Sequence, residues 1–218
     1  MQQSRTDIIE KLAKELKPVQ VLAPYWHLGF SVLVPMVVVS LATAFLTSMM
    51  FSDFGFSVDR LANSKFIFEQ ILLFFVALSG VMVTLALSRP GVEVKVMQRI
   101  CIGALVVWTV LGMSVLDSFL MPQFNVNLAL FGYKCLVVSG LSGMPVGIIL
   151  FKLINKGVVL NTPLNLFFLA ISAMAMGCFA LQFFCPIVPG SIKLIWHVLP
   201  IYVFSYLSFY LLPRTLFS

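Results

Sequence analysis

Six long apolar segments constrain what this chain can fold into. They run over residues 28–50, 66–87, 100–121, 128–151, 164–184 and 192–212. Each is close to the roughly 20 residues that an α-helix needs to cross about 30 Å of hydrocarbon, and the alternating pattern of barrel strands is absent. We therefore expect an all-α integral membrane protein, a six-helix bundle with short connections.

The composition supports a membrane protein. Of the 218 residues, 61% are hydrophobic and 10% are charged, whereas about 25% of the residues of a soluble domain are charged. The net charge of +6 comes from 14 Lys and Arg against 8 Asp and Glu. These basic residues are too few and too scattered to form a nucleic-acid-binding stripe. We expect the lipid bilayer, and no nucleic acid, as a direct partner.

The chain divides into an arm, residues 1–27, and a transmembrane domain, residues 28–218. The first apolar segment is longer than the core of about 7–15 residues of a signal peptide, so we expect the arm to be retained. Ten Lys and Arg fall in the arm, in alternate connections and after the last span, and four fall in the other connections. The positive-inside rule then predicts that both termini are cytoplasmic.

The arm has the pattern of a short amphipathic helix. Ile8, Leu12 and Leu16 share one helical stripe, and Pro18 marks the end of the helix. Because an isolated helix of this length is marginal in water, it needs a surface to lie on. Two interpretations stay open: the helix lies on the bilayer or the bundle, or it docks in a groove of a cytoplasmic protein.

Two of the four cysteines are expected at the outer edge of the membrane. Cys135 begins a stretch just long enough to cross the bilayer, and Cys185 precedes the last outer connection. In an oxidising compartment such thiols form a disulfide or bind a soft metal, and inert packing is the alternative. For Cys101 and Cys178 we expect packing as small hydrophobic residues.

His197 is expected at a similar depth in the last span. Pro200 cannot donate a backbone hydrogen bond to the carbonyl of Trp196, so the helix is locally open there and can aim the imidazole into the bundle. With Cys135 and Cys185, His197 would complete a three-ligand soft-metal site. The alternative is a structural imidazole bonded to a backbone carbonyl.

Small residues in the fourth and fifth spans predict close helix packing. Gly143 and Gly147 form GxxxG, and Ala173 with Gly177 is a second pair at the same spacing.

Standard catalytic motifs are absent from the sequence. It has no G-x-S-x-G, H-E-x-x-H, phosphate-binding loop, dinucleotide fingerprint or C-x-x-C. We expect no enzyme and no resident cofactor, with at most transient soft-metal binding at the outer cysteines. Two rival classes remain: a membrane thiol oxidoreductase, which normally needs a paired active-site motif, and a small transporter or channel, which would place polar residues near mid-membrane.

The order of these features resembles the NrsF family, bacterial membrane negative regulators of extracytoplasmic-function sigma factors. The resemblance is carried by Arg5-Thr6-Asp7 followed by Leu12, Leu16 and Lys17-Pro18-Val19; by Phe66 to Glu69; by Cys135 ahead of Pro145; and by Cys185-Pro186 followed by Trp196-His197. Members are similar in having six membrane helices.

The resemblance implies a bacterial inner-membrane anti-sigma factor. Its cytoplasmic arm would hold an extracytoplasmic-function sigma factor until heavy metal or oxidative stress is sensed outside. Cys135 and Cys185 would take the sensing role, with His197 beside them. Partner binding falls to residues of the arm: Arg5, Asp7, Ile8, Leu12 and Leu16.

We hypothesise that oxidation or metal binding at the cysteines shifts the fourth span against the fifth and releases the docked partner.

Overall fold

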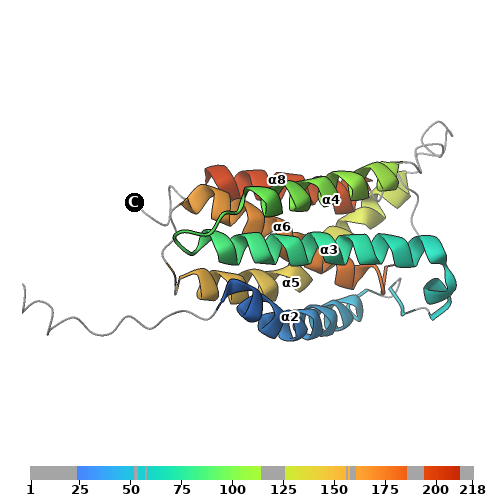
Figure 1. The fold of residues 1–218 in the computed structure, drawn as a ribbon. Helices are drawn as coiled ribbons and strands as arrows, with labels where there is room; N and C mark the ends of the chain where they lie inside the picture. Colours follow the sequence, from blue (N-terminus) through green and yellow to red (C-terminus); the bar gives the residue numbers. More distant parts are fainter. Residues whose placement is uncertain are drawn as a thin grey trace, which may run out of the picture.

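The computed structural model describes residues 24–51, 54–56, 58–113, 126–155, 157, 161–185 and 194–211. Their regular structure is entirely helical, which confirms the all-α class for this part of the chain (Figure 1). The elements are α2 (Tyr25–Ser48), the 3₁₀-helix η1 (Val58–Ala62), α3 (Ser64–Leu87), α4 (Lys95–Met113), α5 (Val126–Ile154), α6 (Thr162–Leu181), the π-helical turn η3 (Leu194–Val198) and α8 (Leu199–Tyr210). The predicted partner-binding residues, Arg5, Asp7, Ile8, Leu12 and Leu16, lie outside the described part, whereas the end of the predicted arm is described and belongs to α2 from Tyr25 on.

Four helices, α2, α3, α5 and α6, are long and apolar enough to cross a membrane. The two remaining apolar segments are shorter as described. α4 has 19 residues and the stretch Ile195–Tyr210 forms a shorter apolar helix. Residues 114–121, the end of the third predicted span, lie outside the described part. The helices thus support a membrane protein, and four of the six predicted spans meet the criteria of length and composition.

Several helix boundaries differ from the apolar segments. α4 begins at Lys95 rather than at residue 100, because polar residues extend the helix beyond its apolar stretch. α6 ends at Leu181, and a turn over residues 182–184 follows it. The last predicted helix begins with a π-helical turn just before Pro200, where the missing N–H predicts an irregularity.

Asparagine caps fix the starts of two helices. The side chain of Asn63 accepts hydrogen bonds from the backbone N–H groups of Lys65 and Phe66 at the start of α3. Asn161 accepts one from Leu164 at the start of α6. These bonds satisfy donors that the first turn of a helix leaves free.

α6 is the central helix of the bundle. It contacts α2, α3, α5 and α8, and in Figure 1 it runs behind α3. In the most apolar 18-residue stretch of α6, 78% of the residues are buried, compared with 22% in that of α2. α3 and α6 are antiparallel, because Asn165 Nδ2 donates to Thr84 O at one end (3.2 Å) and Gln70 Nε2 donates to Gln182 Oε1 at the other (2.8 Å).

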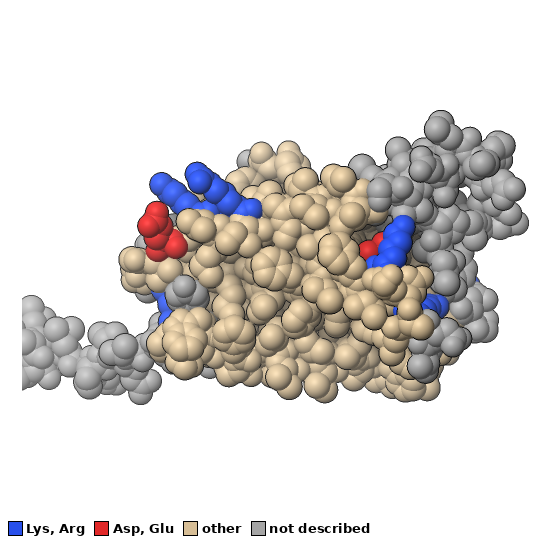
Figure 2. Space-filling model, turned by 45° about the vertical axis from the view of Figure 1, so that its right-hand side comes forward, with Lys and Arg blue, Asp and Glu red and all other residues tan. Residues whose placement is uncertain are grey.

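Charged side chains gather at the two ends of the bundle, with an uncharged band between them (Figure 2). We call the end that holds Cys135 and Cys185 the thiol end. Near the thiol end lie Arg60, Lys65, Glu69 and Lys134, and near the opposite end lie Arg89, Glu93, Lys95, Arg99 and Lys152. The band exposes large apolar side chains on every peripheral helix, among them Val34, Ile71, Val106, Ile148 and Phe204. A lipid-facing surface has this composition.

The backbones of α5 and α6 are in direct contact. A Cβ atom added at Gly143 would overlap the carbonyl oxygen of Ala173, and one added at Gly177 would overlap that of Ser139. By contrast, a Cβ atom at Gly140, one turn earlier on α5, would meet nothing within 4 Å. The predicted close packing of small residues is therefore present at Gly143 and Gly177.

This contact predicts different effects for two glycine substitutions on one helix. We expect Gly143→Ala to lower the free energy of unfolding by about 1–3 kcal/mol, because α5 and α6 must separate. Gly140→Ala should not lower it and should raise it by up to about 1 kcal/mol, because alanine is the better helix former and the added Cβ atom meets nothing. Reversible unfolding in mixed detergent micelles measures both, and equal losses in the two variants would contradict the close contact.

Candidate functional site

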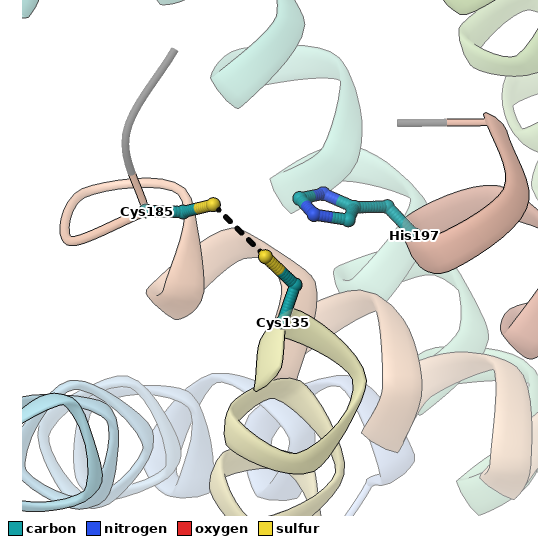
Figure 3. A group of neighbouring side chains, drawn as sticks. All are labelled: Cys135, Cys185 and His197. Atoms are coloured by element: carbon teal, nitrogen blue, oxygen red, sulfur yellow. Dashed lines mark hydrogen bonds between the residues drawn. The ribbon is translucent and has the colours of Figure 1, made fainter. Parts of the chain in front are cut away.

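The candidate site brings together three side chains from distant parts of the chain (Figure 3). Cys135 lies in the first third of α5, Cys185 in the turn after α6, and His197 in η3. One sulfur, Cys135 Sγ, lies 3.1 Å from the other, Cys185 Sγ. Because a disulfide bond measures about 2.05 Å, the pair consists of two thiols that are not joined in a disulfide and that share a weak hydrogen bond. The ligand atoms of all three residues lie within 4.8 Å of one another.

All three side chains are deeply buried. The exposed fractions are 0% for Cys135, 4% for Cys185 and 2% for His197. Val138, Leu181 and the two thiols form an apolar cluster, and Phe51 and Phe54 pack against it. A backbone hydrogen bond from Gly55 N to Phe184 O, 3.0 Å long, ties the segment after α2 to the turn that holds Cys185. The thiol pair is thus closed off from water.

The imidazole of His197 has an unusual environment. Neither ring nitrogen is in hydrogen-bonding geometry with a partner, although the ring faces Cys135 (Figure 3). The backbone carbonyl of His197 accepts a bond from the Cys178 thiol, 3.7 Å away. The alternative of an imidazole bonded to a backbone carbonyl is therefore wrong, and both nitrogens remain available to a ligand.

A glycine on α5 explains why η3 lies so close to the thiols. A Cβ atom at Gly132 would overlap the indole ring of Trp196, so the indole packs directly on the backbone of α5. Gly132 precedes Cys135 by one helical turn, and Trp196 precedes His197 by one residue. The packing of Trp196 on Gly132 therefore brings His197 close to Cys135.

Arg60 on η1 is a residue that the sequence analysis missed. Its Nη1 atom donates a hydrogen bond to the carbonyl oxygen of Gln182, 2.9 Å away, in the turn that leads to Cys185. Burial lowers the pKa of the Arg60 guanidinium, and the charge of the Cys185 thiolate opposes that shift. A cation beside a thiol favours the reactive thiolate. The sequence offered one signal for Arg60: it is a basic residue in a connection predicted to lie outside the membrane, on the same side as the two cysteines.

The other two cysteines lie apart from the pair. Cys101 is fully buried between α4 and α3, where its thiol donates to Val76 O at 3.8 Å. Cys178 on α6 is also fully buried and belongs to the main hydrophobic core of the bundle. Both have the environment of small hydrophobic residues.

The geometry allows two kinds of chemistry at the pair. A two-electron oxidant could join the sulfurs in a disulfide after a movement of about 1 Å. A soft cation could replace both thiol protons and bind between the sulfurs. Either event would join the first third of α5 to the turn that follows α6.

The fold and the site define a class: the described part of the chain is all-helical, with four helices long and apolar enough to cross a membrane and a buried dithiol at one end of the bundle. The chain belongs to the NrsF family, because the model of that family, described as negative regulator of sigma F, matches residues 12–217. The resemblance drawn from the sequence is thereby confirmed. No curated protein and no solved structure matches the chain.

The short distance between the sulfurs predicts a selective cross-link. We expect the two-electron oxidant diamide to form the Cys135–Cys185 disulfide in the purified protein, since these two thiols are already in contact. Alkylation of the denatured protein followed by peptide mass spectrometry would locate the bond.

In the same experiment, Cys101 and Cys178 should stay reduced during the oxidation and should therefore be found alkylated. Cys178→Ser should leave the cross-link intact, and Cys135→Ser should abolish it. A dominant cross-link through Cys178 would show that the observed pairing is incorrect.

Proposed function

We propose that this protein is a six-span anti-sigma factor of the bacterial inner membrane that senses an outer signal at the thiol pair. The arm, residues 1–27, would hold an extracytoplasmic-function sigma factor in the cytoplasm. Heavy metal or oxidant acting on Cys135 and Cys185 would then release it. The observation that carries the proposal is the 3.1 Å contact between two reduced, buried thiols in a chain whose family model is described as negative regulator of sigma F.

The arrangement of the shorter helices supports six spans. α4 packs along α3, and α8 packs along α6. α4 and α8 are also joined by a hydrogen bond between the hydroxyl groups of Thr109 and Tyr202, 2.9 Å apart. At about 1.5 Å per residue, the described apolar part of α4, residues 100–113, covers about 21 Å of the roughly 30 Å of the hydrocarbon core.

The distribution of charge supports an orientation with both termini in the cytoplasm. An even number of spans puts the termini on one side, and the positive-inside rule assigns that side to the end that carries Arg89, Lys95 and Lys152. The thiol end would then face the periplasm, where thiols are readily oxidised.

The contact between α5 and α6 supports a route for the signal. Cys135 and Cys185 lie at one end of this antiparallel pair, and Gly143 and Gly177 hold the two backbones together nearer its middle. A bond or an ion between the sulfurs would change the position of α5 relative to α6 and move their opposite ends. A switch of this kind needs a coupling free energy of about 1–3 kcal/mol between the two sites.

The burial of the pair favours regulation over catalysis. Phe51 and Phe54 cover the thiols, so a reactant reaches them only after these rings move. Slow entry suits a signal that acts once per molecule better than a substrate that turns over. We propose that the protein is not an enzyme and has no resident cofactor.

The proposed arm predicts a loss of partner capture on truncation. Deletion of residues 1–17 should abolish co-purification of the sigma factor from native membranes, read by mass spectrometry. Leu12→Asp on the apolar stripe should do the same, because a charge there prevents docking in an apolar groove. Lys14→Gln, off that stripe, is the matched control and should retain capture. Full capture by the truncated protein would exclude the arm as the docking element.

If the two cysteines are the sensor, a variant that lacks both thiols should not respond to the signal. The double variant Cys135→Ser/Cys185→Ser should still capture the sigma factor but should not release it on treatment with oxidant or soft metal. The matched control Cys101→Ser/Cys178→Ser should release it normally.

Release by the Cys135→Ser/Cys185→Ser protein would rule out the thiol switch. If the intact protein captures no sigma factor, the anti-sigma role itself is wrong. Flux measurements in vesicles and a thiol-oxidase assay would then test the transporter and oxidoreductase classes.

A further inference from the structure

We propose that His197 is a third ligand that makes the thiol pair a buried three-ligand site for a soft or borderline divalent cation of the Cd²⁺ and Zn²⁺ type. The inference rests on the proposed function only for its meaning as a sensor, because cation binding itself does not depend on a sigma factor. Of the two reactions that the pair allows, disulfide formation and cation binding, the inference concerns cation binding.

The first observation is that ligand atoms converge from three separate elements. Two sulfurs and an imidazole nitrogen lie within 4.8 Å of one another. Two sulfurs bound to one ion at about 2.3 Å each and at a tetrahedral angle lie about 3.8 Å apart. The sulfurs of Cys135 and Cys185, now 3.1 Å apart, would open by about 0.7 Å to reach that geometry. Such a shift is within the reach of side-chain rotation.

The second observation is the state of the imidazole. His197 is 2% exposed, and neither of its ring nitrogens has a hydrogen-bond partner. Buried polar atoms without a partner are uncommon in folded proteins and ask for an explanation. In Figure 3 the ring points toward the sulfur of Cys135. A cation held between the three side chains would give one nitrogen its missing partner.

The balance of charge suits the surroundings. Binding replaces the protons of both thiols, so a divalent cation with two thiolates and a neutral imidazole carries no net charge. A neutral centre fits a site lined by Phe51, Phe54 and Leu181, because an uncompensated charge is very unfavourable in apolar surroundings. Thiolate and imidazole ligands also select soft and borderline metals over Mg²⁺ and Ca²⁺.

His197 distinguishes cation binding from oxidation. A disulfide needs only the two sulfurs, whereas a stable cation site of this size needs a third donor. Replacement of His197 should therefore separate the two reactions in one protein.

The test is a Zn²⁺ titration of the reduced, full-length protein in detergent micelles, in competition with a chromophoric chelator. We expect the unmodified protein to bind a single Zn²⁺ per chain. His197→Gln should weaken this affinity by about 10–100-fold or more, since even partners of metal ligands have effects of that size. His27→Gln is the matched control, because His27 is exposed on α2 and stacked on Trp26. Its affinity for Zn²⁺ should not change.

Diamide treatment checks that the variant is folded. His197→Gln should still form the Cys135–Cys185 disulfide, which shows that the thiols remain adjacent. X-ray absorption at the zinc edge of the unmodified protein needs no variant and should show two sulfur ligands together with imidazole scattering.

A zinc site with sulfur ligands but no imidazole would overturn the proposal, as would an unchanged affinity in His197→Gln or no binding by the reduced protein. None of these results affects capture of the sigma factor. Loss of capture by the intact protein would instead refute the proposed function and leave the zinc measurements valid.

Discussion

The close approach of α5 and α6 is the contact on which the rest of the structure depends. Gly143 and Gly177 let the two backbones touch, and in a lipid environment such van der Waals packing replaces the hydrophobic effect as the force between helices. α6 in turn contacts α3 and α8. The same approach sets the register that brings Cys135 beside Cys185, so the packing of the bundle and the geometry of the site have one cause.

Hydrogen bonds between buried polar groups help to determine how the packed helices align along their axes. The amides of Gln70 and Gln182 pair between α3 and α6 near the thiol end, and Asn165 bonds to Thr84 O near the opposite end. Hydrogen bonds between membrane helices contribute modestly to stability, but they favour one register of neighbouring helices. Arg60 extends this polar framework to the connection before α3.

Hydropathy predicted the helical class and the approximate positions of the helices, because a membrane span is long and uniformly apolar. It also gave depth: Cys135, Cys185 and His197 were expected at a similar level. It could not give position around the bundle, since two residues at one depth can lie on opposite sides. The 3.1 Å contact depends on the α5–α6 register and on the packing of Trp196 on Gly132. Arg60 was missed for a related reason: η1 is short, and Arg60 bonds to a backbone carbonyl, which no pattern of side chains marks in a sequence.

A single hydroxyl group links the first described helix to this central pair. Ser40 Oγ of α2 lies 3.1 Å from Ser142 O on α5 and 3.3 Å from Met176 O on α6. If α5 and α6 slide past each other, the two carbonyl oxygens separate, and the one hydroxyl can follow only one of them. α2 must then shift or turn with the helix that keeps the bond. Because α2 begins at Tyr25, the last residues of the arm belong to this helix, and such a displacement would move that end of the arm directly.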